Sequence, residues 1–408
     1  MVAIDEYLAI VGESEIDGIK QLAGLIKGEK VVHVNATPYG GGVAEMLRRV
    51  VPLAQSLGIS ASWQTIRGNE EFFSITKRLH NALQGDASVG ISEGEWKKYH
   101  DIAEFNSSIL SLDGDVVVIH DPQPLPLINF KKGGKWVWRC HIDTSSPNMG
   151  VWSRLSGMVN MFDASVFSME RYIPKDLEIQ ALIDHPTIDP LSPKNEPLSA
   201  DQIEKVLLRY GLDPERPIIG QVGRYDPWKD PIGAIKVYRS IKSEMSSVQF
   251  VMIGSFAKDD PEGSEWYNKT VSFAGKDKDC FILSNLDGVG DIEVNAFQRG
   301  FSAALQMSIR EGFGLTVTEA LWKGVPVVAT RAGGIPLQVI DGVTGFLVSN
   351  YEEAAGKLRH LLKKRWLARE LGQAGMRHVR LNFLITKGIM DYIRMHIELV
   401  GKSKATAR

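Results

Sequence analysis

Short apolar runs alternate with helix-forming segments along the first half of the chain. Such runs are typical of strands buried on both faces, and they are predicted at 30–36, 59–66, 116–120, 136–142 and 166–168. Helical spacing before the first strand involves Ile19, Leu22, Leu25 and Ile26. A further helix is predicted from Ala44 to about Leu57. Strands that alternate with helices predict a parallel sheet covered on both faces.

The same alternation restarts after a proline-rich segment. Three prolines lie within residues 183–193, so neither a helix nor a central strand is expected there, and we interpret this segment as a linker between domains. Beyond it, strands are predicted at 218–222, 248–253, 280–283, 303–306 and 327–329. Helices are predicted at 231–243 and 315–323, and a helical tail at about 351–400.

The two halves predict an α/β protein with two Rossmann-like, doubly wound domains that face each other across a cleft. The N-terminal domain is expected over residues 1–190 and the C-terminal domain over 191–379. A C-terminal helix at about 380–408 is expected to pack back onto the first domain. The carboxyl ends of both sets of strands would line the cleft, which is the default place for a ligand.

Composition narrows the function classes. The 408 residues include 47 basic and 49 acidic side chains, so neither nucleic acid nor an anionic membrane is an expected partner. Two cysteines, Cys140 and Cys280, are too few for a disulfide scaffold or a cysteine-based zinc site. Asp5 and Glu6 lie where a secretory signal carries Lys or Arg, and no apolar run approaches a membrane span. We expect a cytoplasmic protein.

A glycine run, Gly40–Gly42, lies between the first predicted strand and the helix after it. Glycine there lets backbone amides approach an anion near the positive end of a helix, although a tight turn explains the run equally well. The G-x-G-x-x-G fingerprint is absent here, and no acidic residue ends the next strand near Gln64–Ile66. An oxidoreductase is therefore disfavoured.

Polar residues follow two further strands of the first half. His120, Asp121 and Gln123 follow one strand, and His141 and Asp143 follow the next. They could bind sugar hydroxyls or stabilise developing positive charge at the cleft. A structural histidine or a helix-capping aspartate is an equally consistent reading of each. Neither H-E-x-x-H nor G-x-S-x-G occurs, so a zinc protease and a serine hydrolase are disfavoured.

Two cations follow the first strand of the second half. Arg224 ends the strand, and Lys229 comes five residues later, just before a helix. An arginine fork and a lysine point charge at the carboxyl end of a strand can clamp a diphosphate. Surface ion pairs with Asp226 and Asp230 are the alternative.

An acidic and glycine-rich segment comes later in the same half. Glu311 lies in a loop between a strand and a helix, and Gly312 and Gly314 leave room for a phosphate at the free amides of the first helical turn. Glu319 falls inside that helix, where an ordinary solvated residue is the alternative.

In this order the motifs resemble the retaining GT-B glycosyltransferases of family 4. They are R-x4-K at 224–229 and E-G-F-G-L-x3-E at 311–319, and segments 324–330, 332–336 and 341–347 also match that family. The resemblance covers nearly the whole chain. Within the family, segments 120–124, 138–143 and 188–195 resemble the archaeal enzymes that form trehalose.

The resemblance implies a hexosyltransferase that moves glucose from UDP-, ADP- or GDP-glucose to the anomeric hydroxyl of free glucose. The products would be α,α-trehalose and the nucleoside diphosphate, in a reversible reaction. It also implies retention by front-face attack, in which the departing phosphate takes the proton of the acceptor. No cofactor or metal is expected to be required, and magnesium would be a stimulant at most. The expected partners are glucose, the nucleotide sugar and a second copy of the chain in a homodimer.

The same resemblance implies a role for each motif residue. Arg224 and Lys229 would neutralise the diphosphate, Glu311 would hold the hydroxyls of the donor glucose, Glu319 would bind the ribose, and His141 would lie near the anomeric centre. The remaining donor contacts would come from Gly41, Gly42, Gly312, Phe313, Gly314, Leu315 and Thr316. The weaker candidates for acceptor contacts are Asp121, Gln123 and Asp143.

Three alternatives stay open. The chain could be a trehalose phosphorylase, which uses phosphate in place of the nucleotide, or another family 4 enzyme that forms sucrose or transfers mannose. It could also be a sugar- or nucleotide-binding protein without activity, although a binding protein need not keep the full set of Arg224, Lys229 and Glu311. The preferred base of the nucleotide is open as well.

Overall fold

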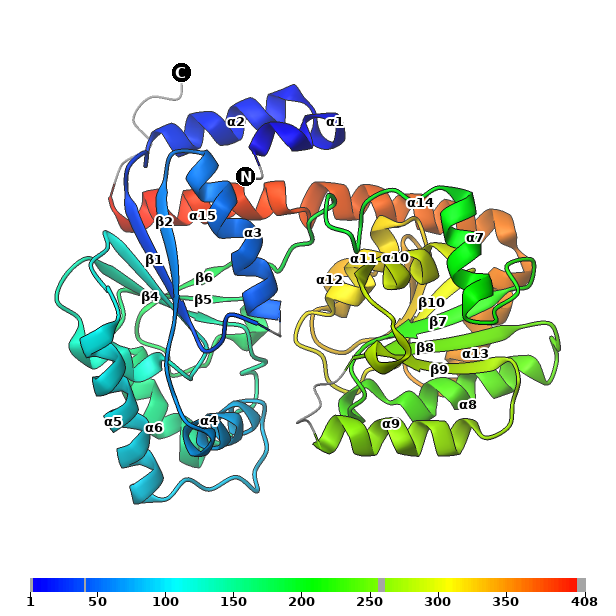
Figure 1. Cartoon of the computed structure of the whole chain (residues 1–408), viewed down its shortest axis with the longest axis horizontal. Coiled ribbons are helices and arrows are strands. Elements are labelled where there is room, and N and C mark those ends of the chain that lie inside the picture. The colour runs from blue at the N-terminus through cyan, green and yellow to red at the C-terminus, as the bar shows by residue number, and fades with distance from the viewer. Residues whose placement is uncertain (1–2, 40–41, 256–260, 402–408) are drawn as a thin grey trace. The chain divides into compact units, whose positions relative to one another are not determined.

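The computed structural model describes residues 3–39, 42–255 and 261–401. The chain forms two compact units, which we describe separately: unit 1 comprises Met1–Pro186 and Ile385–Arg408, and unit 2 comprises Thr187–Leu384 (Figure 1). These limits replace the expected domain limits of 190 and 379. The chain leaves unit 1 inside the proline-rich segment.

Unit 1 is built on a six-stranded parallel sheet with the strand order β2-β1-β3-β4-β5-β6. All residues of its central strand β3 are buried, as expected for a parallel strand covered on both faces. The strands are β1 (Lys30–Asn35), β2 (Ser60–Thr65), β3 (Val116–His120), β4 (Lys135–Cys140), β5 (Ala164–Phe167) and β6 (Gln180–Ile183).

Helices cover this sheet, and α15 packs with α2 and α3 and reaches β1 through a hydrogen bond between Tyr392 and His33. The helices of unit 1 are α1 (Leu8–Val11), α2 (Glu13–Gly24), α3 (Gly42–Ser56), α4 (Glu70–Leu83), α5 (Glu93–Ile109), α6 (Met149–Val159) and α15 (Ile385–Leu399). Its short 3-10 helices are η1 (Ile4–Tyr7), η2 (Leu125–Phe130) and η3 (Glu170–Tyr172). Of the apolar spacing predicted before β1, Ile19 and Ile26 are buried, Leu22 is half-buried and Leu25 is exposed.

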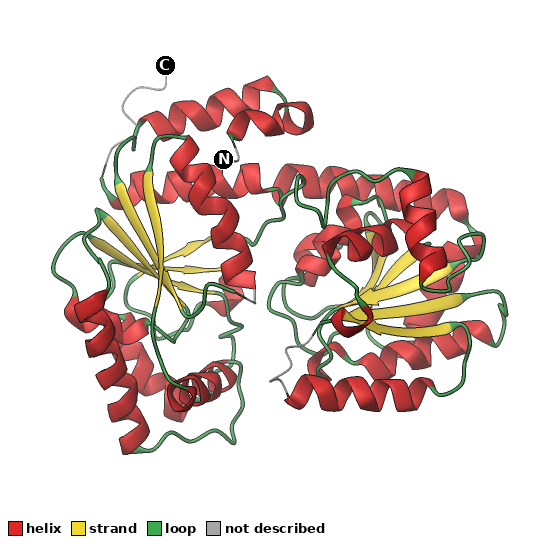
Figure 2. Cartoon of the chain, in the orientation of Figure 1, coloured by secondary structure: helices red, strands yellow, loops and turns green. Residues whose placement is uncertain are grey.

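Unit 2 repeats this plan with the parallel strand order β12-β11-β10-β7-β8-β9. Figure 2 shows the strands of each unit lying between helices. The strands of unit 2 are β7 (Ile218–Val222), β8 (Gln249–Gly254), β9 (Cys280–Ser284), β10 (Ala303–Gln306), β11 (Val327–Thr330) and β12 (Gly345–Val348).

The core of unit 2 joins this sheet to α8 and α13 through fully buried side chains such as Tyr238, Phe250 and Leu358. The helices of unit 2 are α7 (Ala200–Arg209), α8 (Pro231–Lys242), α9 (Pro261–Ala274), α10 (Asp291–Gly300), α11 (Leu315–Trp322), α12 (Ile335–Gln338), α13 (Tyr351–Lys363) and α14 (Arg365–Asn382). Its 3-10 helices are η4 (Pro227–Lys229) and η5 (Asn285–Asp287).

The predicted class, α/β with two doubly wound domains, is confirmed, but two strands were missed. β6 and β12 have four residues each and lie at the edges of their sheets. An edge strand is covered less completely than a central one, and β6 accordingly has no buried residue and an apolar run of only three residues. The predicted helical tail is three helices, α13, α14 and α15, interrupted at Lys364 and Phe383.

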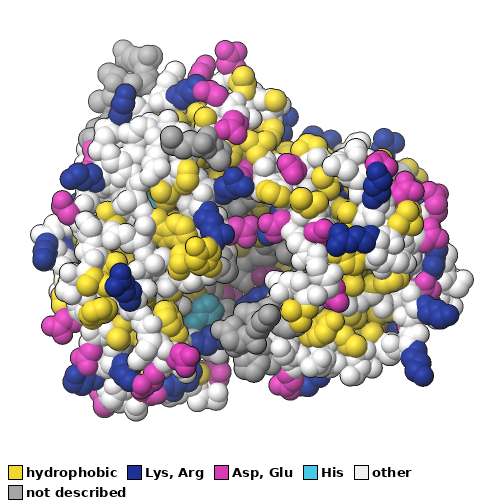
Figure 3. Space-filling model, viewed as in Figure 1, with side chains coloured by type: hydrophobic (Ala, Val, Ile, Leu, Met, Phe, Trp, Pro, Cys, Tyr) yellow, Lys and Arg dark blue, Asp and Glu magenta, His cyan; other side chains and the backbone are white. Residues whose placement is uncertain are grey.

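The surface in Figure 3 carries acidic and basic side chains mixed together, without a large basic patch on the face that is drawn. Within the described ranges, no helix is long and apolar enough to cross a membrane. Cys140 and Cys280 are both free thiols.

Candidate functional site

Lys229 and Glu311 form an ion pair in unit 2, between Nζ and Oε2. The lysine follows β7 and the glutamate follows β10, and these two strands are neighbours in the sheet. Only 13% of the lysine side chain and 8% of the glutamate side chain are exposed. Ser308 Oγ donates a hydrogen bond to the same carboxylate at 3.3 Å. Two residues predicted to bind different parts of one ligand are therefore in direct contact.

Gln221, in β7, positions the lysine turn. Its Nε2 donates to the carbonyl oxygen of Lys229 at 2.8 Å, and its Oε1 accepts from the amide of Met307 at 3.0 Å. Asp226 caps the same turn by accepting from the amide of Lys229 at 3.0 Å. Sequence reasoning missed Gln221. The available signal was a polar, fully buried residue inside an apolar strand.

The alternative of surface ion pairs holds for Arg224 and is wrong for Lys229. Arg224 is 67% exposed, and its Nη2 lies 3.3 Å from Asp226. Asp230 instead caps α8 by accepting from the amide of Gly233 at 2.9 Å, and the hydroxyl of Tyr351 donates to it at 2.7 Å. Its left-handed φ of 46° is part of this cap.

The glycine-rich segment before α11 packs against a second glycine turn. A Cβ atom on Gly333 would lie 1.7 Å from the carbonyl oxygen of Glu311, and the amide of Gly334 donates to Gly312 O at 3.1 Å. Gly314 caps α11 with a φ of 91°. The first-turn amides of an α-helix have no partner within the helix, so this end of α11 suits an anion. Phe313 is buried, and Leu315 and Thr316 are half-buried in the first turn.

Glu319 is 5% exposed, so the alternative of a solvated helix residue is wrong. Lys194 Nζ lies 3.9 Å from its carboxylate. The ammonium of Lys323 donates to the backbone carbonyl of Glu319 at 3.2 Å and to Asn195 Oδ1 at 2.8 Å. Burial lowers the pKa of Lys323 to about 7, although the charge of Glu319 opposes this shift. Glu319 thus lies inside the unit, close to the ammonium of Lys194 and to the buried amine of Lys323.

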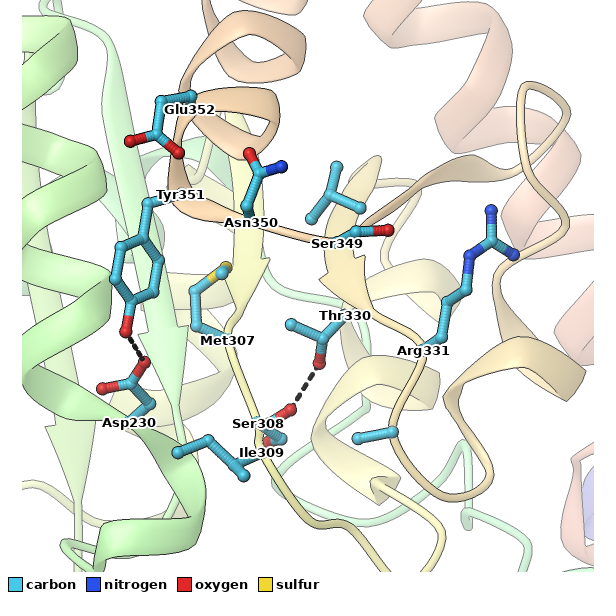
Figure 4. A pocket seen from close by; sticks show the side chains of 12 residues that line it. Asp230, Met307, Ser308, Ile309, Thr330, Arg331, Ser349, Asn350, Tyr351 and Glu352 are labelled. Atoms are coloured by element: carbon cyan, nitrogen blue, oxygen red, sulfur yellow. Dashed lines mark hydrogen bonds between the residues drawn. The ribbon is translucent and has the colours of Figure 1, made fainter.

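A pocket of about 510 Å³ opens at the carboxyl ends of β10, β11 and β12, and Figure 4 shows the side chains that line it. Ser308 connects the pocket to the Lys229–Glu311 pair, because it lines the pocket and bonds Glu311. None of the predicted site residues lines it. The lining residues are Asp230, Met307, Ser308, Ile309, Thr330, Arg331, Ala332, Val348, Ser349, Asn350, Tyr351 and Glu352.

Unit 1 brings His120 and His141 together. His120 Nδ1 lies 3.0 Å from His141 Nε2, with the two rings stacked. The chain of contacts continues from His120 Nε2 to His33 Nδ1 at 3.0 Å, and from His33 Nε2 to the hydroxyl of Tyr392 at 3.0 Å. Sequence reasoning missed His33 and Tyr392, because one lies inside an apolar strand and the other in the last helix.

The three histidines are neutral at physiological pH. Burial lowers the pKa of His33, His120 and His141 well below the usual value of a histidine, and the positive charge of Arg139 lowers each further. The guanidinium of Arg139 is itself buried and paired with Asp184.

Asp121 fixes the backbone at His141, the last ring in this series of hydrogen bonds. Its Oδ1 accepts from the amide of His141 at 2.8 Å, its φ is 61°, and burial raises the pKa of its carboxyl to about 7. Asp143 accepts from the amide of Ser145 at 3.0 Å and from its hydroxyl at 2.6 Å, which closes a local turn. Gln123 is half-buried in a turn after β3.

For the other predicted positions, Gly42 begins α3, and Gly41 lies outside the described residues. Among the residues that the structure describes, no group of three or more His, Cys, Asp or Glu side chains could hold a metal ion.

Comparisons with known proteins match both halves. Residues 33–174 match the family "Trehalose synthase, N-terminal domain", and residues 203–378 match "Glycosyl transferases group 1". The chain is 46% identical to a trehalose synthase of Pyrococcus horikoshii over 98% of its length and 97% of the relative. It is 45% identical to a trehalose synthase of Rubrobacter xylanophilus, with the same two coverages.

More distant proteins share parts of this similarity. A trehalose phosphorylase of Pleurotus pulmonarius is 27% identical, with 92% of this chain matching 58% of that protein. Among solved structures, the sucrose-phosphate synthase of Thermosynechococcus elongatus superposes with a TM-score of 0.71 at 15% identity, over 92% of this chain and all of the other. This likeness shows the GT-B fold.

Proposed function

Because the chain belongs to the trehalose synthase family of the group 1 glycosyl transferases, we propose that it transfers glucose from a nucleoside-diphosphate glucose to the anomeric hydroxyl of free glucose. The chain is a hexosyltransferase, and the proposal concerns its substrates and mechanism. The observation that carries it is the buried Lys229–Glu311 pair at the carboxyl ends of β7 and β10. The product would be α,α-trehalose.

The donor diphosphate would bind at the cations that follow β7. Arg224 has an exposed guanidinium, and Lys229 has an ammonium held close to Glu311. Negative charge grows on the leaving diphosphate as the glycosidic bond breaks, so cations already in place favour the transition state over the ground state. The first-turn amides of α11 would add donors to the distal phosphate.

Two glutamates would hold the sugars of the donor. Glu311 is held by Lys229 and by the Ser308 hydroxyl, so its carboxylate is oriented for the hydroxyls of the glucose. Glu319 would accept hydrogen bonds from the ribose, with the ammonium of Lys194 3.9 Å from its carboxylate.

The acceptor would contact the polar residues after β3 and β4, with His141 near the anomeric centre and Asp121, Gln123 and Asp143 around it. Retention by front-face attack, in which the leaving phosphate takes the acceptor proton, needs no carboxylate nucleophile. We propose that a metal is not required, because Arg224 and Lys229 supply positive charge at the diphosphate.

Trehalose phosphorylase is the rival function, with phosphate in place of the nucleotide. The lower identity to such an enzyme and the buried carboxylate of Glu319 both favour the nucleotide sugar. The two functions differ in the donor of the glucose, which is a nucleotide sugar in the proposed function and glucose 1-phosphate in a phosphorylase.

NMR analysis of the products tests the proposal. The protein is incubated with glucose and UDP-, ADP- or GDP-glucose, with and without magnesium. A parallel sample contains glucose 1-phosphate as the donor. We expect α,α-trehalose and one equivalent of nucleoside diphosphate, without a need for magnesium. Trehalose formed only from glucose 1-phosphate would make the chain a phosphorylase, and a β-linked product would exclude retention.

A further inference from the structure

Four buried or partly buried rings form one chain of hydrogen bonds in unit 1. It runs from the hydroxyl of Tyr392 to His33 Nε2, from His33 Nδ1 to His120 Nε2, and from His120 Nδ1 to His141 Nε2. Each of the three contacts is 3.0 Å long. Tyr392, His33 and His120 are buried, whereas His141 is half-buried. The chain therefore leads from the interior of the unit to the histidine expected at the anomeric centre.

The register of the sheet explains why the histidines meet. His33 pairs with Val118 across β1 and β3, so His120, two residues later, lies on the same face as His33. His120 pairs with Arg139 across β3 and β4, and His141, two residues beyond Arg139, continues this row. Tyr392 reaches His33 from α15.

None of the imidazole rings in this series of hydrogen bonds is positively charged. Burial is the main reason that the pKa values of His33, His120 and His141 lie well below the usual range, and burial raises the pKa of Tyr392. The charged and titratable groups near these rings, among the described residues, include Arg139, which is paired with Asp184, the neighbouring His396, and Asp121, whose carboxyl accepts from the amide of His141. All three imidazoles are therefore neutral, and each holds one proton on one of its two nitrogens.

A row of neutral rings has two possible directions. In the first, Tyr392 donates to His33, each ring donates to the next, and His141 carries its proton on Nδ1. In the second, His141 donates from Nε2 to His120, His120 donates to His33, and His33 donates to the oxygen of Tyr392. The hydroxyl proton of Tyr392 must then find another acceptor.

The surroundings of Tyr392 favour the first direction. Its hydroxyl is buried, and within the described residues its hydrogen-bond partner is His33. His396 does not accept from it, because His396 Nδ1 bonds the backbone carbonyl of Tyr392 at 2.7 Å and its Nε2 has no partner among the described residues. A buried hydroxyl without an acceptor is costly, whereas the Nδ1 proton of half-buried His141 can reach solvent or a ligand.

We propose that Tyr392, His33 and His120 are positioning residues that act as a one-way hydrogen-bond relay, which holds His141 neutral with its proton on Nδ1. His141 then presents an N–H donor to a substrate oxygen and cannot act as a general base through that nitrogen. The use of this donor in catalysis rests on the proposed function, whereas the tautomer of His141 is a property of the protein without substrate.

Nitrogen-15 NMR of the full chain, labelled at histidine, reads the tautomer directly. We assign the His141 signals by their loss in His141→Gln. The expected spectrum has a protonated-type shift at Nδ1 and an unprotonated-type shift at Nε2. The reverse pattern, or an average of both, would overturn the relay whether or not the chain transfers glucose.

Two variants of His120 test whether this residue must donate a hydrogen bond to His141. In His120→Asn the side-chain amide occupies roughly the place of Nδ1 and can still donate to His141 Nε2, whereas the similarly sized leucine of His120→Leu cannot. We expect the Nδ1-H tautomer to persist in the asparagine variant and to be lost in the leucine variant. The same tautomer in both variants would contradict the proposal.

The smallest change is Tyr392→Phe, with Tyr172→Phe as the control at another buried tyrosine of unit 1. Loss of the Tyr392 hydroxyl should give a mixture of His141 tautomers and lower kcat on the order of tenfold, with KM for the donor little changed. The control should change neither. A mixed tautomer with unchanged kcat would show that the donor is not used in catalysis and would overturn that part of the proposal.

Discussion

At the residue scale, the site of unit 2 depends on a lysine and a glutamate that compensate each other while largely buried. Neither Lys229 nor Glu311 could lie at such low exposure without a partner of opposite charge, because an unpaired buried ion is costly. The pairing also holds both charges in one place. Gln221 supports this arrangement through the backbone.

A double-mutant cycle separates stability from turnover. Lys229→Met should lower the free energy of unfolding by about 3–5 kcal/mol, because it leaves the Glu311 carboxylate buried without its cation. Adding Glu311→Gln should restore most of that loss. Turnover should fall on the order of 100-fold or more in both single variants and stay low in the double variant. Denaturant unfolding and trehalose formation are the two measurements.

Recovery of turnover together with stability would mean that the pair has only a structural role. The types and order of Arg224, Lys229, Glu311 and Glu319 could be predicted from their motifs. Their contacts could not, because Lys229 and Glu311 meet only when β7 and β10 become neighbours. The predicted contacts with a ligand remain predictions.

At the element scale, two loops that are far apart in sequence are packed backbone against backbone. Gly333, in the turn before α12, has a φ of 51° and lies against the carbonyl of Glu311. The absence of a side chain is what lets the loop before α11 sit at this depth. The position of Glu311 therefore depends on a turn about twenty residues later in the chain.

Gly333→Ala should displace Glu311, because the added Cβ atom would lie 1.7 Å from its carbonyl oxygen. A shift of about 1 Å can lower turnover on the order of 100-fold. Gly356→Ala, in the interior of α13, is the control, since nothing lies within 4 Å of its Cβ atom. It should stabilise slightly and leave kcat unchanged. Equal kcat values in the two variants would contradict the role of this turn.

At the scale of the whole molecule, the end of the chain belongs to the unit in which the chain begins. α15 contacts α2 and α3 and buries Ile389 and Ile393 in unit 1, while the preceding helix α14 belongs to unit 2. Tyr392 joins the histidine chain from the same helix. Unit 1 is therefore incomplete until the last helix has been made.

Replacing Ile389 and Ile393 together by serine should lower the free energy of unfolding of unit 1 by about 2–5 kcal/mol per site. Hydrogen exchange should then rise in β1, β3 and β4 and stay unchanged in β7 and β10, because the two units have separate cores. Arg394→Ser, at an exposed position of the same helix, should change neither. A parallel rise in both units would show that they unfold together.

By itself, the sequence determined the two doubly wound halves, the linker and the order of the charged motifs. These depend on local periodicity, on proline and on short spacings, which are properties of neighbouring residues. The two edge strands escaped because each has only four residues, too few for a clear periodic signal, and β6 in addition has no buried residue.

Only the tertiary structure decided which side chains meet. The histidine chain requires the register of β1, β3 and β4 together with a helix more than 240 residues further along the chain. Tertiary packing likewise brings Gln221 to the carbonyl of Lys229 and Gly333 to the carbonyl of Glu311. The physical reason is that partners and burial are set by long-range packing, and burial in turn sets the charge state of groups such as His120.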